Sequence, residues 1–164
     1  MTYTLEQMAD REAIRTRLYD YARGVDRLDR SLVEQAIWPD ATLAFPDHGF
    51  TGDREAFIDW CWPLLRSMNR TQHMLCNIRI KIDGDDAAVE TYLQGYHEIA
   101  DEGGVKRDLM IGARYLDRFE KRENDWRIVR RELVQEWMRQ YPDTQIANTS
   151  SARGDADPSY RLFA

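Results

Sequence analysis

Three histidines are the side chains of this sequence best suited to general base chemistry, because imidazole changes its charge near neutral pH. His73 opens a predicted strand in the segment TQHMLCN, and His97 lies inside the next predicted strand. His48 lies in a loop rich in Gly, Pro and Asp. A single histidine is more often structural or solvated than catalytic, so a catalytic interpretation needs a partner side chain.

A carboxylate that could be this partner stands at the end of the first predicted helix. In the segment YARGVD, Tyr21 and Val25 belong to the apolar stripe of the helix, and Asp26 falls where the helix gives way to a turn. The structural interpretation makes Asp26 a cap for the next helix. The functional interpretation points its carboxylate into the cavity under the helix, where it could hold a histidine ring.

An arginine stands between two apolar positions of the last predicted strand. Val129, Arg131 and Leu133 alternate on one face of this strand. A guanidinium in such a place is costly unless it is paired or used. A salt bridge to an acidic neighbour such as Glu90 or Glu132 is the structural interpretation.

Other patterns that carry chemistry are weak in this sequence. No His-x-His, HExxH or His/Cys cluster predicts a metal site, and Gly103-Gly104 lacks the rest of a nucleotide-binding fingerprint. Cys61 lies between two tryptophans, which indicates a core residue, and Cys76 could be a small residue facing a pocket. Arg153-Gly154-Asp155 matches an integrin-type tripeptide, which we interpret as a coincidence.

The elements that must position these residues come as helices first and strands afterwards. Thr4 and Thr51 are predicted N-caps, Gly24 is the predicted end of the first helix, and Pro63 is predicted to kink the third. Helices followed by an antiparallel meander predict an α+β fold, with the helices on one face of a curved sheet. The predicted elements are helices over 4–25, after Asp29 and after Thr51, and strands over 41–45, 72–82, 89–99, 109–122 and 126–138.

Composition limits the classes of partner. A chain of 164 residues with 43% hydrophobic residues fits one domain. Its formal net charge of −6, without a basic face, argues against nucleic acid or an anionic membrane as a partner. The sequence has two cysteines and lacks the roughly 20-residue apolar stretch of a membrane span, so we expect a soluble, cytoplasmic protein.

The order and spacing of several segments resembles the SnoaL-like branch of the nuclear-transport-factor-2-like superfamily. The matching segments are REAIRTRLYDYARGVDRLD, a PDA strand, a TGDREAF helix start, TQHMLCNIRI and the hairpin RYLDRFEKRENDWRIVRREL. Within that branch the chain looks most like cofactor-free lyases, namely hexachlorocyclohexane dehydrochlorinases, bile acid 7α-dehydratases and, more distantly, scytalone dehydratases. The resemblance implies a cone-shaped barrel, in which a curved, mainly antiparallel sheet wraps around the N-terminal helices and encloses a deep pocket.

The resemblance also implies roles for single residues. The GVD motif places the catalytic aspartate of the family at Asp26, the TQH motif places its histidine at His73, and the last strand places a pocket arginine at Arg131. Tyr21 stands where the dehydrochlorinases carry a lysine and the bile acid dehydratases a tyrosine, which favours an oxygen leaving group over a halide. The residues expected to line the pocket are Trp38, Phe45, Phe57, Trp60, Cys76, Tyr92, Tyr96, His97 and Tyr115.

The function that follows is dehydration or a related β-elimination on a hydrophobic cyclic or aromatic molecule, such as a steroid, a bile acid or a lignin-derived diaryl compound. His73, held by Asp26, would be the general base, and no cofactor or metal is expected. One alternative is a lyase that releases formaldehyde from a diaryl diol. Another is a binding or adaptor module, since a fold alone does not fix function.

The resemblance also shapes the expected organisation of the chain. It implies a catalytic domain over 1–140 and a homo-oligomer, with a trimer favoured over a dimer. The tail over 141–164 is polar but ends in the apolar segment PSYRLF. We expect this segment to dock on the same subunit or on a neighbouring one.

Overall fold

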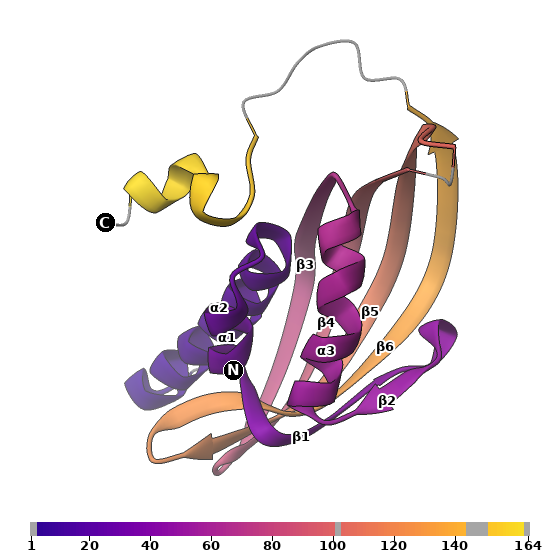
Figure 1. Ribbon diagram of the computed structural model, residues 1–164. Helices are drawn as coiled ribbons and strands as arrows, with labels where there is room; N and C mark the ends of the chain where they lie inside the picture. Colours follow the sequence, from indigo (N-terminus) through magenta and orange to yellow (C-terminus); the bar gives the residue numbers. More distant parts are fainter. Residues whose placement is uncertain (1–2, 101–102, 144–150, 163–164) are drawn as a thin grey trace.

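The computed structural model describes residues 3–100, 103–143 and 151–162. In these residues, helices pack on one face of a curved sheet (Figure 1). The helices are α1 (Leu5–Arg27), α2 (Arg30–Ala36) and α3 (Arg54–Ser67), with short 3-10 helices η1 (Pro46–His48), η2 (Gly154–Ala156) and η3 (Pro158–Arg161). The strands are β1 (Ile37–Phe45), β2 (Phe50–Gly52), β3 (Arg70–Asp83), β4 (Asp86–Ala100), β5 (Lys106–Arg122) and β6 (Asp125–Pro142).

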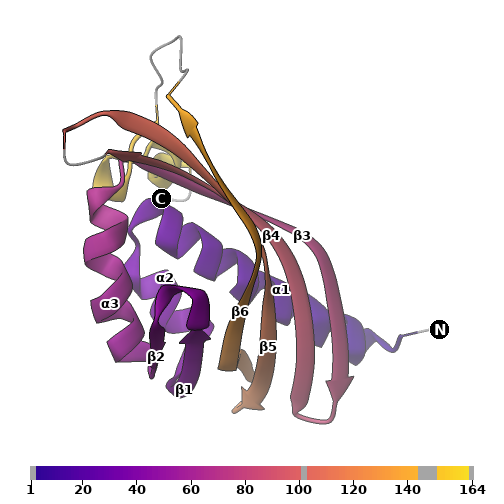
Figure 2. The same cartoon turned by 90° about the vertical axis from the view of Figure 1, so that its right-hand side faces the viewer.

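The six strands form one open sheet in the order β2-β1-β6-β5-β4-β3. Every neighbouring pair is antiparallel except β1 and β6, which run parallel. The predicted α+β class and the mainly antiparallel sheet are therefore confirmed. The expected barrel is corrected to an open sheet, because β2 and β3 remain as separate edges; Figure 2 shows its long strands curving beside α1.

Helix α1 begins as predicted and ends later than predicted. The side chain of Thr4 accepts a hydrogen bond from the backbone N–H of Gln7, and the Gln7 side chain accepts one from the backbone of Thr4, which is a complete capping box. The helix runs past Gly24 to Arg27. Gly24 instead allows α2 to approach, since a Cβ there would lie 2.7 Å from Val33 Cγ2.

Two aspartates cap the other helices. Asp29 accepts from the backbone N–H of Leu32 at the start of α2, and Asp53 accepts from Ala56 at the start of α3. The predicted cap Thr51 is wrong, because this residue lies in β2. Asp26 caps neither helix, so its carboxylate is available for another contact.

The core lies between the helices and the sheet. Its largest fully buried side chains include Trp126, Phe57 and Phe119, and the indole N–H of Trp126 donates to Asp10 of α1 at 2.8 Å. The other face of α1 is charged, which suits a helix exposed to water. Within the described ranges, no helix is both long and apolar enough to cross a membrane.

The described part of the C-terminal tail lies beside α1 of the same chain (Figure 1). Its contacts there are polar. The Tyr160 hydroxyl donates to Asp29 at 2.8 Å, and Arg23 donates to the Ser159 hydroxyl at 3.0 Å. Leu162 of the expected apolar segment is 76% exposed, and Phe163 lies outside the described residues.

Candidate active site

A cavity of about 400 Å³ lies between α1, α3 and the inner face of the sheet. Its volume falls in the range of small-molecule sites, and most of its lining is apolar or aromatic. All three histidines of the chain lie on its wall. The polar or aromatic lining residues are Tyr21, Phe45, Asp47, His48, Phe57, Trp60, His73, His97, Tyr115 and Gln135.

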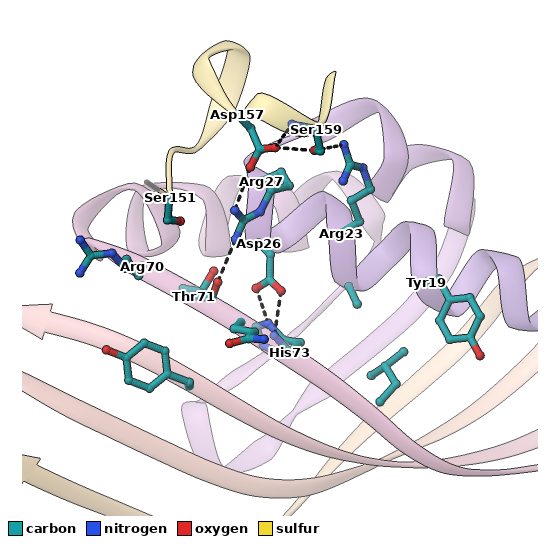
Figure 3. Close-up of a pocket in the computed structure, with 14 residues that line it drawn as sticks. Tyr19, Arg23, Asp26, Arg27, Arg70, Thr71, His73, Ser151, Asp157 and Ser159 are labelled. Carbon is teal, nitrogen blue, oxygen red and sulfur yellow. Dashed lines mark hydrogen bonds and ion pairs between the residues drawn. The ribbon is translucent and has the colours of Figure 1, made fainter. Parts of the chain in front are cut away.

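Asp26 and His73 meet beside this cavity through two hydrogen bonds. His73 belongs to the cavity lining, and Asp26 lies behind it in the neighbouring pocket that Figure 3 shows. Oδ1 of Asp26 lies 2.7 Å from the ring Nδ1 of His73, and Oδ2 accepts from the backbone N–H of His73, also at 2.7 Å (Figure 3). The two contacts fix both the position and the rotation of the ring. With its Nδ1 donating to the carboxylate, a neutral imidazole keeps its lone pair on Nε2.

The environment of Asp26 keeps the carboxyl group ionised. Burial raises its pKa, but the hydrogen bonds and charge of His73, with a hydrogen bond from Thr71, outweigh burial and hold the pKa below its ordinary value. The carboxylate therefore carries a full negative charge at neutral pH. It can stabilise the imidazolium that forms when Nε2 takes a proton.

Gly95 makes room for two imidazole rings. It pairs with His73 across β3 and β4, and His97 follows two residues later on the same face. A Cβ on Gly95 would lie 2.9 Å from His97 Cε1 and 3.6 Å from His73 Nε2. The two rings stand edge to face with centroids 5.3 Å apart.

His97 is a neutral ring at neutral pH. Burial and the neighbouring His73 lower its pKa to about 4. Its side chain is 7% exposed, and its Nδ1 is one of the buried polar atoms without a partner among the described residues. Gln135 Oε1, from β6, is another. Both residues line the cavity, so a polar ligand group could satisfy them.

Two tyrosines line the cavity in front of Arg131. The Arg131 guanidinium lies 4.1 Å from the Tyr21 ring centroid and 3.9 Å from that of Tyr115. Burial raises the pKa of Tyr21 well above its ordinary value of 10.0, and that of Tyr115 to about 12. Both hydroxyls therefore keep their protons at neutral pH and can donate hydrogen bonds.

The structure corrects the expectation that Arg131 faces the pocket. Its guanidinium donates to both carboxylate oxygens of Asp117, at 2.8 and 2.7 Å, and the pair is fully buried. The expected salt bridge therefore exists, but its partner is Asp117 rather than Glu90 or Glu132. Arg131 supports the two tyrosine rings from behind and is absent from the cavity lining.

Four other expected pocket residues lie elsewhere. Trp38 donates to the Glu120 carbonyl and stacks under Arg122 and Arg127 outside the cavity. Because side chains alternate along a strand, Cys76, Tyr92 and Tyr96 are absent from this cavity lining. Tyr96 instead lines the neighbouring pocket with Asp26 and His73.

Sequence reasoning missed three residues of this region. Gly95 had a readable signal, because an isolated glycine inside a strand often marks a close approach. Asp117 also had one, because it alternates with the aromatic residues Tyr115 and Phe119, as Arg131 does with its apolar neighbours. Gln135 had none, since a polar residue near the end of a strand does not reveal which face is buried. Within the described ranges, no group of three His, Cys, Asp or Glu side chains could hold a metal ion.

Comparison with known proteins identifies a family to which most of the chain matches. A family model described as a SnoaL-like domain matches residues 6–132. An uncharacterized protein of Mycobacterium tuberculosis is 26% identical over 129 residues, which cover 78% of this chain and 86% of that protein.

Solved structures share the fold. A hexachlorocyclohexane dehydrochlorinase, LinA type 2, superposes with a TM-score of 0.79 at 21% identity, covering 89% of this chain and 98% of that one. A putative scytalone dehydratase from Novosphingobium aromaticivorans superposes with a TM-score of 0.73 at 20% identity, covering 89% and 97%. At these identities the similarity shows a common fold.

Proposed function

Because the chain belongs to the SnoaL-like domain family, we propose that it is a cofactor-independent lyase that eliminates water from a hydrophobic substrate containing a ring. The observation that carries this proposal is His73 on the wall of an apolar cavity, held from behind by Asp26 through two contacts of 2.7 Å. Similarity to a dehydrochlorinase and to a putative scytalone dehydratase supports the same class of reaction.

In the proposed reaction, His73 Nε2 removes a proton from the carbon beside the one that carries the hydroxyl. The electron pair of the C–H bond becomes the new C=C bond, and the C–O bond breaks. Asp26 stabilises the resulting imidazolium. General base catalysis contributes on the order of 10²–10⁴-fold, so other groups must assist.

The leaving hydroxyl needs a proton, and the cavity tyrosines supply it in this proposal. Tyr21 and Tyr115 are buried and protonated, because burial raises the pKa of each hydroxyl more than the charge of Arg131 lowers it, so each can donate its proton to the leaving oxygen. The hydroxyl leaves as water. The tyrosine regains the proton that His73 took, so the enzyme returns to its starting state.

The lining indicates what the substrate looks like. Aromatic rings of Phe45, Phe57 and Trp60 contact one another in a cluster against which a flat ring can pack, with Phe45 stacked on Phe57 and Trp60 tilted against both. The unpartnered atoms of His97 and Gln135 favour a substrate with oxygen atoms at separate positions. Hydroxylated steroids, bile acids and lignin-derived diaryl diols fit this description.

The test uses purified protein without added metal or cofactor and a panel of these three compound classes, with product masses followed by liquid chromatography. Loss of water in wild type, abolished by His73→Ala, supports the dehydratase. Tyr92→Phe is a control on the outer face and keeps wild-type turnover. Tyr21→Phe lowers kcat without preventing binding.

Other outcomes decide against dehydration. Loss of formaldehyde from a diaryl diol, abolished by His73→Ala, identifies the carbon–carbon lyase instead. Tight binding without turnover, unaffected by His73→Ala, identifies a carrier or adaptor and overturns the proposal.

A further inference from the structure

Arg153, in the C-terminal tail, reaches the back of the Asp26–His73 pair. We call residues 151–162 the strap. Figure 3 shows the strap over the end of α1, and Arg27 fastens it there through an ion pair of 2.9 Å with Asp157. Arg27 also donates to the carbonyls of Ala152 and Thr71, at 3.2 and 3.1 Å.

The Arg153 guanidinium uses all five of its N–H donors on this chain. Nε donates to the Asp26 carbonyl at 2.8 Å. Nη1 donates to the carbonyls of Leu65 and Met68, at 2.8 and 3.0 Å. Nη2 donates to the Val25 carbonyl and to the Thr71 hydroxyl, both at 3.3 Å.

These acceptors come from three elements that meet at the candidate active site. Val25 and Asp26 are in the last turn of α1, Leu65 and Met68 are at the end of α3, and Thr71 is in β3. Carbonyls in the last turn of a helix lack partners within the helix and carry a partial negative charge. A single guanidinium therefore neutralises and joins the ends of both helices.

The residues that Arg153 joins either line the cavity or contact the Asp26–His73 pair. Val25, Leu65 and Met68 line the cavity, and Thr71 donates a hydrogen bond to the Asp26 carboxylate. Arg153 thus holds the backbone of Asp26 while the carboxylate of the same residue holds His73. Asp26 lies inside the matched SnoaL-like domain, which ends at residue 132, whereas Arg153 lies outside it.

We propose that Arg153 is a positioning residue, which sets the place of Asp26 and through it the orientation of His73. The Arg153-Gly154-Asp155 tripeptide thereby has an internal role, since its arginine is directed into the protein. The effect on turnover rests on the proposed function. The effect on the His73 ring does not, because it can be measured without substrate.

The experiment compares Arg153→Ala, Arg153→Lys and the matched control Arg161→Ala in the full chain. Arg161 is an exposed arginine of the same strap. The main readout is the NMR signal of the His73 Nδ1 proton in protein with ¹⁵N-labelled histidine, assigned with His73→Gln. Thermal melting reports separately on stability.

We expect Arg153→Ala to broaden or lose this signal through faster exchange with water, while Arg161→Ala leaves it unchanged. Millimolar guanidinium restores the signal in Arg153→Ala by filling the vacated site. Arg153→Lys recovers only part of it, because an ammonium lacks the planar fork. On a substrate found by the panel, Arg153→Ala lowers kcat by on the order of 10–100-fold with little change in KM.

A wild-type His73 signal in Arg153→Ala, even in a protein that melts earlier, would show a purely structural role and overturn the proposal. Absence of any lyase activity in the wild type would sink the proposed function instead. The NMR comparison would still decide the role of Arg153.

Discussion

Asp26 holds His73 through both oxygens of its carboxylate, and this double contact determines what a substitution removes. Asp26→Asn keeps the shape of the side chain but leaves only one oxygen that can accept a hydrogen bond. One of the two N–H groups of His73 therefore faces the N–H of the new amide. The ring then adopts the wrong tautomer or turns. We expect kcat to fall by about 10³-fold or more, measured under saturating substrate.

Asp20→Asn is the control for this substitution. Asp20 lies six residues earlier on α1 and pairs with Arg17 at 3.2 Å, away from the cavity. The activity of the Asp20→Asn variant should match that of the wild type. Equal activities of Asp26→Asn and Asp20→Asn would remove the pair from the mechanism.

His97 makes the stability of the protein depend on pH. Its pKa is about 4 in the folded state against an ordinary 6.5, so the unfolded chain binds more protons between these values. The free energy of unfolding therefore falls as the pH falls through this window, by about 2 kcal/mol between about pH 7.5 and pH 5. This difference in the free energy of unfolding is measured by urea titrations at the two pH values, with tryptophan fluorescence as the signal.

His97→Gln removes the titrating group and should flatten this pH dependence. His48→Gln makes the same substitution at an exposed position. Because His48 is the smallest of the causes that lower the pKa of His97, this variant should keep most of the pH dependence. If His97→Gln and the wild type lose the same free energy on acidification, another group is responsible.

At the scale of elements, periodicity predicted the helices because their apolar stripes are regular. Ile14, Leu18, Tyr21 and Val25 are all buried, as the three- and four-residue steps of α1 require. The helix caps were harder to predict. Thr51 and Asp53 are both good N-cap residues, and only the short pairing of β2 with β1 decides between them.

The faces of the strands were predictable only in part. Ile78, Ile80 and Ile82 alternate, which places Cys76 on the same face if the strand is regular. The pairing of β3 with β4 shifts register between Leu75 and Ile78, and this bulge reverses the alternation. His73 consequently faces the cavity and Cys76 faces outward, which no count of residues reveals.

In β4 the alternation of side chains is regular, and it is sufficient to predict which of them face the cavity. Tyr92 and Tyr96 are an odd number of residues from His97, so a regular strand cannot turn all three into one cavity. The prediction of His97 as a lining residue agrees with the structure, and the prediction of Tyr92 was wrong. Tyr96 lies outside this cavity but lines the neighbouring pocket with Asp26 and His73. The partner of Arg131 was unpredictable for another reason, since it depends on the register between β5 and β6.

The contact between α1 and α2 offers a test of element packing. A Cβ on Gly24 would lie 2.7 Å from Val33 Cγ2 and 3.0 Å from the backbone of Asp29 and Val33. Overpacking costs typically 1–3 kcal/mol, and alanine gains about 1 kcal/mol in a helix. We expect Gly24→Ala to lower the free energy of unfolding by about 1 kcal/mol in urea titrations.

Val33→Ala tests the cause of this loss. It removes the nearest atom, so Gly24→Ala combined with Val33→Ala should cost less than the sum of the single substitutions. Additive costs would mean that the close approach is not what requires glycine.

At the scale of the whole molecule, the two faces of the sheet differ in what covers them. The helices and the strap cover one face and its end (Figure 1). On the other face, exposed apolar side chains lie on β3, β4 and β6, namely Met74, Tyr92 and Trp137. Pairing places Met74, Gln94, Gly112 and Trp137 in one row, and Tyr92 lies beside it.

This outer row leads us to propose that the sheet packs against another copy of the chain. Met74, Tyr92 and Trp137 are 43%, 43% and 40% exposed, and large apolar side chains gathered on one exposed face of a sheet are typical of a contact site.

Light scattering after size-exclusion chromatography measures the assembly. We expect a homo-oligomer, with a trimer favoured, and a shift to monomers in Trp137→Glu and Met74→Glu, because each buries a charge in an apolar contact. Leu5→Glu is the control, since Leu5 is an 86% exposed apolar residue at the start of α1. A wild type that is monomeric at all concentrations would contradict the proposal, and oligomers that survive both outer substitutions would place the contact on another surface.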